Sequence, residues 1–238
     1  MTPQARLIAT AQSQDGYLGK KSNSQLDSFT ANAGGKFNKF ARDLDAIMGF
    51  YNGKKQGADW CDVYVDWCFV QTFGVDLALA LTCQPKSSCG AGTAYSLGYY
   101  RARGQLFTEP QPGDQIFFGD GKSTWHTGIV TAVRDGCVFT EEGNSGVKSG
   151  VHSFKYPIGS KSIKGYGRPD WSLVPDESEE ENDMAVTYKT LADVPDWYKP
   201  TVDKLVKAGA LNGTGDGLNV SEDFCRTMTV LDRLGKLD

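Results

Sequence analysis

The spacing of apolar residues changes near residue 110, and this change constrains the fold more than any other feature. Before it, residues 37–47 and 60–74 carry apolar side chains at the helical repeat or nearly all round, and a further helix is predicted over 91–103. After it, apolar and polar residues alternate in short segments separated by Asp-Gly turn signals. The strands predicted from this alternation cover 115–118, 126–133, 138–142 and 165–169. Helices followed by antiparallel strands predict an α+β domain, with the N-terminal helices packed on the sheet.

An acidic segment, residues 175–183, separates this domain from the end of the chain. Its clustered like charges repel one another and have nothing to bury, which is typical of a linker. Beyond it, two helices are predicted over 194–208 and 221–235, on either side of a glycine-rich loop. We therefore expect a first domain over residues 1–174 and a small all-α helical hairpin over residues 184–238.

The composition excludes several classes of protein. A net charge of −4 without a basic stripe argues against a nucleic-acid-binding groove. Six cysteines without a Cys-x-x-Cys pair, and only two histidines, argue against a zinc site, although a disulfide between Cys83 and Cys89 stays open. We find no apolar run long enough for a signal peptide or a transmembrane segment, which predicts a protein made and held in a cytosol.

Cys61 lies where a predicted helix begins, directly after Trp60 and with Asp59 as the expected N-cap. The unpaired N–H groups and the dipole at this end of a helix favour a thiolate, which is the reactive form of cysteine. Cys68 lies roughly 10 Å deeper along the same helix and is interpreted as a buried hydrophobic residue. Cys61 is therefore the candidate nucleophile, and it needs a base nearby.

Histidine is the residue type that supplies such a base. His126 begins a predicted strand, whereas His152 follows the strands without a feature that would hold it near a helix terminus, so His126 is preferred. A third polar group usually orients a cysteine–histidine pair. Glu141, Glu142 and Asn144 are the candidates.

Strand register decides between these three residues. If Asp135-Gly136 formed a tight two-residue turn, His126 would share a face with Glu141. A bulge near Gly136 instead sets Val130 opposite Glu142 and places Glu142 and Asn144 on the side of His126. This second register also gathers apolar side chains of the two strands on the opposite face: Ile129, Val133 and Phe139. We therefore predict the second register, with Glu141 as a solvated surface charge.

Four motifs resemble the CHAP domain, the cysteine, histidine-dependent amidohydrolase/peptidase family of peptidoglycan hydrolases. In chain order they are Trp60-Cys61-x-x-Tyr64-Val65-x-Trp67, Pro112-Gly113-Asp114-Gln115-Ile116-Phe117-Phe118, His126-Thr127-Gly128-Ile129-Val130 and Glu142-Gly143-Asn144. The resemblance covers about residues 1–170 and implies a papain-like domain that cleaves an amide bond in the peptide part of the cell wall, as an N-acetylmuramoyl-L-alanine amidase or an endopeptidase. It implies that Cys61 is the nucleophile, His126 the general base and acid, and Glu142 or Asn144 the orienting residue. Trp60 and Trp125 are candidate substrate-binding residues.

The domain plan and the missing signal peptide resemble a phage endolysin of Gram-positive bacteria, which lyses its host and depends on a separate holin to reach the wall. Residues 184–238 are similar to an S-layer homology repeat, through Asp193-Val194-x-x-Trp197, Leu205, Gly209 and Arg226. That similarity implies wall binding or self-association. Since the two helices carry more apolar side chains than one shared seam hides, we expect homo-oligomerisation through this domain.

Two alternative functions stay open: a non-catalytic wall-binding or S-layer-type protein, and a papain-like protease that acts on proteins. No cofactor is predicted. Calcium is the alternative, because some CHAP domains bind it through an acidic cluster before the catalytic cysteine. The oxygen-bearing residues upstream of Cys61 do not form a dense ligand loop: Asp43, Asp45, Asn52 and Asp59.

Overall fold

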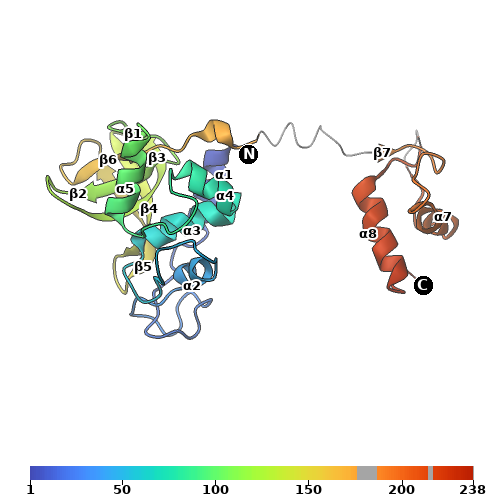
Figure 1. The fold of residues 1–238 in the computed structure, drawn as a ribbon, viewed down its shortest axis with the longest axis horizontal. Helices are drawn as coiled ribbons and strands as arrows, with labels where there is room; N and C mark the ends of the chain where they lie inside the picture. The colour runs from blue at the N-terminus through green and yellow to red at the C-terminus, as the bar shows by residue number, and fades with distance from the viewer. Residues whose placement is uncertain (176–186, 214–216, 238) are drawn as a thin grey trace. The chain divides into compact units, whose positions relative to one another are not determined.

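The computed structural model describes residues 1–175, 187–213 and 217–237. Contacts divide the chain into two compact units, Met1–Val174 and Pro175–Asp238 (Figure 1). The linker that we predicted over 175–183 lies outside the described residues, apart from Pro175. Each unit is described by itself below.

Unit 1, Met1–Val174, begins with helices and continues with strands (Figure 1). Its α-helices are α1 (Pro3–Gln12), α2 (Lys39–Asp45), α3 (Cys61–Phe73), α4 (Val75–Leu81) and α5 (Thr93–Ala102). Its strands are β1 (Leu106–Phe107), β2 (Gln115–Gly119), β3 (Thr124–Arg134), β4 (Cys137–Ser145), β5 (Gly150–Pro157) and β6 (Ile163–Gly167), followed by the 3₁₀ helix η1 (Trp171–Leu173). This order confirms the predicted α+β class.

The six strands form one antiparallel sheet in the order β1-β6-β2-β3-β4-β5. Helix α3 packs on this sheet against β3 and β4, and α1, α2 and α4 pack around α3. Ile129 of β3 and Val151 of β5 belong to the core that these helices share. The opposite face of the sheet buries a second apolar cluster: Ile116, Phe118, Val130, Val138 and Tyr166.

Helix α3 is buried on all sides, because every residue from Cys61 to Val70 is buried. Phe40 of α2 lies at the centre of its aromatic contacts, with ring centroids 5.4 Å from Trp60, 5.2 Å from Tyr64 and 5.0 Å from Trp67. Large buried aromatic side chains contribute much of the stability of a core. The start of α3, where Cys61 lies, is therefore held rigidly.

The β3–β4 hairpin corrects our predicted register. Asp135 and Gly136 form a two-residue turn with φ of 53° and 68°, and Arg134 pairs with Cys137. The bulge lies instead at Thr131 in β3: Ala132 pairs with Phe139 on one side of it, and Val130 pairs with Thr140 on the other. The predicted bulge near Gly136 and the predicted pairing of Val130 with Glu142 are therefore wrong. A bulge at either place shifts the pairing by one residue, so both place Glu142 on the side of His126.

Helix α4 and strand β5 were not predicted. Helix α4 begins directly after Gly74, the residue that ends α3. Strand β5 also escaped prediction, although Phe154 and Tyr156 alternate with the exposed Ser153 and Lys155 along it. As a result His152, interpreted as lying after the strands, is part of the sheet and pairs with Glu142.

Unit 2, Pro175–Asp238, contains β7 (Thr187–Tyr188), α7 (Lys199–Lys207), β8 (Val220–Ser221) and α8 (Glu222–Arg233). The two helices were predicted, but the antiparallel pair β7–β8 makes this unit more than the expected all-α hairpin. Its core consists of Tyr188, Val194, Tyr198, Val202, Val220 and Cys225. In the described part of the chain, no helix is long and apolar enough to cross a membrane.

Candidate active site

The start of α3 places Cys61 as the first residue of the helix, with Trp60 as its N-cap and no side chain capping the end. The predicted capping by Asp59 is therefore wrong. Asp59 instead pairs with Lys36 Nζ at 2.7 Å, and its side chain is largely exposed. Trp60 is fully buried and stacks on Phe40, so it does not contact substrate as we had expected. Its role is to fix the entry into α3.

A cavity of about 460 Å³ opens beside Cys61. It is lined by Asp59, Cys61, Phe118, Trp125, His126, Asn144, Tyr156 and Ser162. The structure thus brings together the predicted nucleophile, the predicted base and Trp125, whose side chain is 54% exposed. Sequence reasoning missed Tyr156 because β5 was not recognised. Phe118 lies in one of the motifs but was given no role, and nothing in the sequence pattern signals Ser162.

His126 is oriented by Glu142. Its Nε2 lies 2.8 Å from Glu142 Oε2, and the carboxylate is almost fully buried. Thr140 donates a hydrogen bond to Glu142 Oε1 at 2.6 Å, and Tyr156 donates one to Oε2 at 3.3 Å. Because Nε2 is engaged by the carboxylate, Nδ1 is the ring nitrogen that remains for a thiol. Glu142 thus fixes both the ring orientation and its tautomer.

Gly128 makes room for this contact. It lies between His126 and Val130 along β3, and a Cβ built on it would lie 2.5 Å from Cγ of Glu142. No side chain fits at such a distance without displacing Glu142. The absence of a side chain at Gly128 therefore lets the carboxylate reach the histidine.

Burial disfavours the thiolate form of Cys61. Burial raises the pKa of Cys61 to about 12, and the negative charge of Asp62 adds to this effect, while backbone hydrogen bonds from Asp62 and Thr127 lower it. The helix N-terminus alone thus does not make a thiolate here, contrary to our expectation. Proton transfer to a neighbouring base is needed to form the nucleophile.

Asn144 lines the same cavity but does not hydrogen-bond the histidine. Its Nδ2 donates to Asp59 Oδ1 at 3.1 Å, and its backbone has φ of 55°, a left-handed conformation that asparagine tolerates. Its buried Oδ1 has no hydrogen-bond partner within the described residues. Of the two predicted orienting groups, Glu142 contacts His126 and Asn144 forms part of the cavity wall.

The other candidates lie away from the cavity. Glu141 lies on the opposite face of β4, is fully buried and accepts a hydrogen bond from Ser153 at 2.8 Å, so the predicted solvated surface charge is wrong. Cys68 is fully buried within α3, as predicted. His152 is partly buried in β5, and its Nε2 has no partner among the described residues.

No group of three or more His, Cys, Asp or Glu residues in the described ranges is arranged to hold a metal ion. The upstream oxygen ligands considered for calcium have protein partners. Asp45 accepts hydrogen bonds from the backbone of Lys55 and Gln56, and Asp43 accepts one from Trp67 Nε1 at 2.9 Å.

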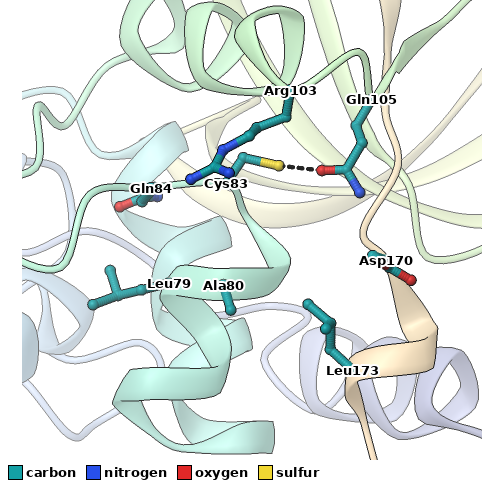
Figure 2. A pocket seen from close by; sticks show the side chains of 8 residues that line it. All are labelled: Leu79, Ala80, Cys83, Gln84, Arg103, Gln105, Asp170 and Leu173. Atoms are coloured by element: carbon teal, nitrogen blue, oxygen red, sulfur yellow. Dashed lines mark hydrogen bonds between the residues drawn. The ribbon is translucent and has the colours of Figure 1, made fainter.

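A second cavity, of about 250 Å³, is lined by residues of α4, the end of α5 and the segment around η1, and by none of the candidate catalytic residues. In Figure 2 the Cys83 sulfur donates a hydrogen bond to Gln105 Oε1, with Arg103 and Asp170 nearby. Cys83 and Cys89 are both free cysteines, so the disulfide that the sequence left open is not formed.

Comparison with known protein families gives a match in the first unit. The family model of the CHAP domain matches residues 53–144, a range that includes Cys61, His126 and Glu142. No curated protein matches the chain. Residues 53–144 are thus similar to the CHAP domain, a family that suggests peptidoglycan hydrolysis by an amidase or peptidase.

Proposed function

We propose that the protein hydrolyses an amide bond in the peptide part of bacterial peptidoglycan, with Cys61 as nucleophile and His126 as general base and acid. The observation that carries this proposal is the cavity that Cys61 and His126 line together, with Glu142 bonded to the histidine at 2.8 Å. A thiol, an imidazole and an orienting carboxylate are the groups that acyl transfer through a cysteine requires.

The reaction begins with transfer of the Cys61 proton to His126 Nδ1. The buried carboxylate of Glu142 stabilises the imidazolium that forms, and the sulfur attacks the carbonyl carbon of the amide. The first turn of an α-helix has backbone N–H groups without an intrahelical partner, and such groups at the start of α3 can donate to the oxyanion of the tetrahedral intermediate. His126 then protonates the leaving amine, and a thioester remains on Cys61.

Water completes the cycle. His126 takes a proton from the water, whose oxygen attacks the thioester carbonyl, and the carboxylic acid product leaves as Cys61 regains its proton. Trp125, exposed at the rim of the cavity, supplies an aromatic surface for the wall polymer.

The test uses purified peptidoglycan. We expect Cys61→Ser and His126→Ala each to abolish release of soluble fragments, because groups that act as a unit lose nearly all activity when one is removed. Cys68→Ser is the matched control and keeps most of the activity. Circular dichroism checks folding, and mass spectrometry of the fragments identifies the bond that is cut.

Other outcomes would favour the alternatives. A Cys61→Ser protein as active as the wild type indicates a non-catalytic wall protein. Turnover of casein without release of wall fragments indicates a protease that acts on proteins.

We further propose that the protein is a phage endolysin that lyses its host and depends on a holin to reach the wall. A hydrolase domain joined to a second compact unit with exposed apolar residues supports this role, since such a unit suits wall binding or self-association. The test is lysis of Gram-positive cells on expression with and without a holin. Lysis that occurs equally without the holin would contradict this dependence.

A further inference from the structure

A chain of buried polar side chains connects the residue after Cys61 with the residue after His126. Asp62, 2% exposed, accepts hydrogen bonds from the backbone N–H of Gly92 at 2.7 Å, from Ser96 Oγ at 2.8 Å and from Gln115 Nε2 at 3.0 Å. The same nitrogen of Gln115 donates to Thr127 Oγ1 at 3.1 Å. Gln115 thus joins α3 to β3 through a single amide group.

The partners fix the orientation of that amide. Thr127 Oγ1 donates its own hydrogen to the carbonyl oxygen of Ile116 at 2.7 Å, so it accepts the bond from Gln115. The carboxylate of Asp62 also accepts, and only the NH₂ end of Gln115 offers two donors. Its Oε1 is buried and has no partner in the part of the chain that the structure describes. An unpaired buried oxygen costs free energy. The amide orientation that gives Asp62 and Thr127 their hydrogen bonds therefore lowers the stability of the fold.

The clamp formed by Gln115, Asp62 and Thr127 lies against the reacting groups. Asp62 directly follows Cys61 in the chain, and the backbone N–H of Thr127 lowers the pKa of the Cys61 thiol. Thr127 also directly follows His126, whose side chain points to the other face of β3. A shift of Thr127 relative to Asp62 therefore moves the donor away from the sulfur and changes the distance between thiol and imidazole.

We propose that Gln115 is a positioning residue that holds the nucleophile helix α3 and the histidine strand β3 in their reactive arrangement. This inference rests on the proposed cysteine mechanism and adds a residue to it that does not line the cavity. A purely structural role for Gln115 predicts lower stability with unchanged reactivity of Cys61. A positioning role predicts a loss of reactivity beyond what the loss of stability explains.

The matched control is Gln84. Its Nε2 donates to Asp66 Oδ1 at 2.5 Å, so it too pairs with a buried aspartate of α3, but at a point roughly 7 Å further along the helix than Cys61. Gln115→Met and Gln84→Met each remove an amide of similar length and burial. They differ in their distance from the nucleophile.

Two readouts are measured on the full chain. The first is kcat and KM for release of fragments from peptidoglycan, and the second is the rate of Cys61 alkylation by iodoacetamide, followed by peptide mass mapping. We expect Gln115→Met to lower kcat by about 100-fold, because a misplacement of reacting groups by about 1 Å can cost that much. KM should stay within about twofold of the wild-type value, and the alkylation rate of Cys61 should change. Gln84→Met keeps both values near those of the wild type.

Thr127→Val tests the same clamp if Gln115→Met does not fold. It removes the hydroxyl and keeps the backbone N–H, so a loss of kcat and a changed alkylation rate again support positioning. Wild-type kcat and alkylation in either folded variant overturn the proposal. If the wild-type protein releases no fragments from peptidoglycan, the proposed function fails, while the alkylation rates still decide whether Gln115 positions Cys61.

Discussion

Glu141 and Glu142 are adjacent in β4, yet their surroundings differ because they lie on opposite faces of the strand. Glu142 meets a histidine, a threonine and a tyrosine, and all three contribute hydrogen-bonding groups to its carboxylate. Glu141 is buried under the helices with one serine bond. Substitutions at the two positions can therefore distinguish the effect of a negative charge beside His126 from that of a negative charge in the core.

Glu142→Gln should leave the cavity intact and remove the charge that stabilises the imidazolium. The amide also presents an NH₂ group to His126 Nε2, which favours the wrong tautomer. We expect kcat to fall roughly 10²–10⁴-fold with little change in KM. Initial rates on purified peptidoglycan measure this. Glu141→Gln is the control at the neighbouring position, and a similar loss in that variant would contradict the assigned roles.

Glu141 should make stability depend on pH. Burial raises the pKa of this carboxyl to about 7, the nearby charges of Asp15 and Glu142 act in the same direction, and the hydrogen bond from Ser153 opposes them. The folded state thus holds its proton at pH values where the unfolded chain has released it. The contribution is fully present below the unfolded pKa, near 4.5, and is lost as pH rises to about 7.

Glu141→Gln removes that dependence. We expect the variant to match the wild type in free energy of unfolding near pH 4 and to exceed it by roughly 3 kcal/mol near pH 8, the free energy that corresponds to a pKa raised from 4.5 to about 7. Urea denaturation at several pH values measures the difference. Parallel curves for the two proteins would show that Glu141 ionises in the folded state as it does in the unfolded chain.

At the scale of elements, the site depends on how closely α3 approaches β4. Gly143 lies where the two meet: a Cβ built on it would lie 2.5 Å from Cβ of Tyr64 and 2.9 Å from a ring carbon of Trp60. Both partners belong to the buried start of α3, so neither has room to move. The glycine between Glu142 and Asn144 therefore sets the distance between the helix that carries Cys61 and the strand that carries the orienting carboxylate.

Gly143→Ala should push α3 from β4 and lower both stability and activity, with kcat reduced by about 100-fold or more. Gly136→Ala is the matched control. Gly136 lies in the β3–β4 turn with φ of 68° and open space around it, so an alanine there costs about 1–2 kcal/mol of backbone strain without touching the site. Denaturation and peptidoglycan assays on both variants separate the two effects. Equal activity in both variants would contradict the role of Gly143.

Helix α3 and the β3–β4 hairpin show which features of the site could be predicted from the sequence. Helix α3 was predicted almost to its bounds, because its long apolar run and Gly74 are strong local signals. The face occupied by Glu142 was also predicted, since the alternation of side chains depends only on whether the pairing shifts by an odd or even number of residues. The position of the bulge was not, because the turn and Thr131 offer equivalent places for one extra residue.

The burial of individual side chains also could not be predicted from the local sequence pattern. Trp60 and Glu141 each occupy positions that suit exposure, and tertiary packing buries both. Trp60 is enclosed by aromatic side chains from distant segments, including Tyr17 and Phe40. Contacts between residues so far apart in sequence leave no periodic signal, so the sequence named Trp60 as a substrate contact when it is part of the core.

At the scale of the whole molecule, unit 2 combines a small core with exposed apolar residues. Trp197 is 64% exposed, Val230 51% and Leu234 65%. Val230 and Leu234 are four residues apart at the end of α8, so they share one side of the helix. Two adjacent exposed apolar side chains on so small a unit make this side of α8 the place to look for a binding surface.

We expect this surface to join two copies of the chain. Pairing hides Val230 and Leu234 from water and brings two catalytic domains to one wall, which raises avidity through effective concentration. Light scattering at micromolar concentration should give an oligomer for the wild type, and a monomer for Val230→Lys with Leu234→Lys and for a chain that ends near Pro175. Ala210→Lys, a charge added at another exposed position of the same unit, should keep the oligomer. If every form is monomeric, including the wild type, self-association fails, and the exposed Trp197 makes wall binding by a single copy the better explanation.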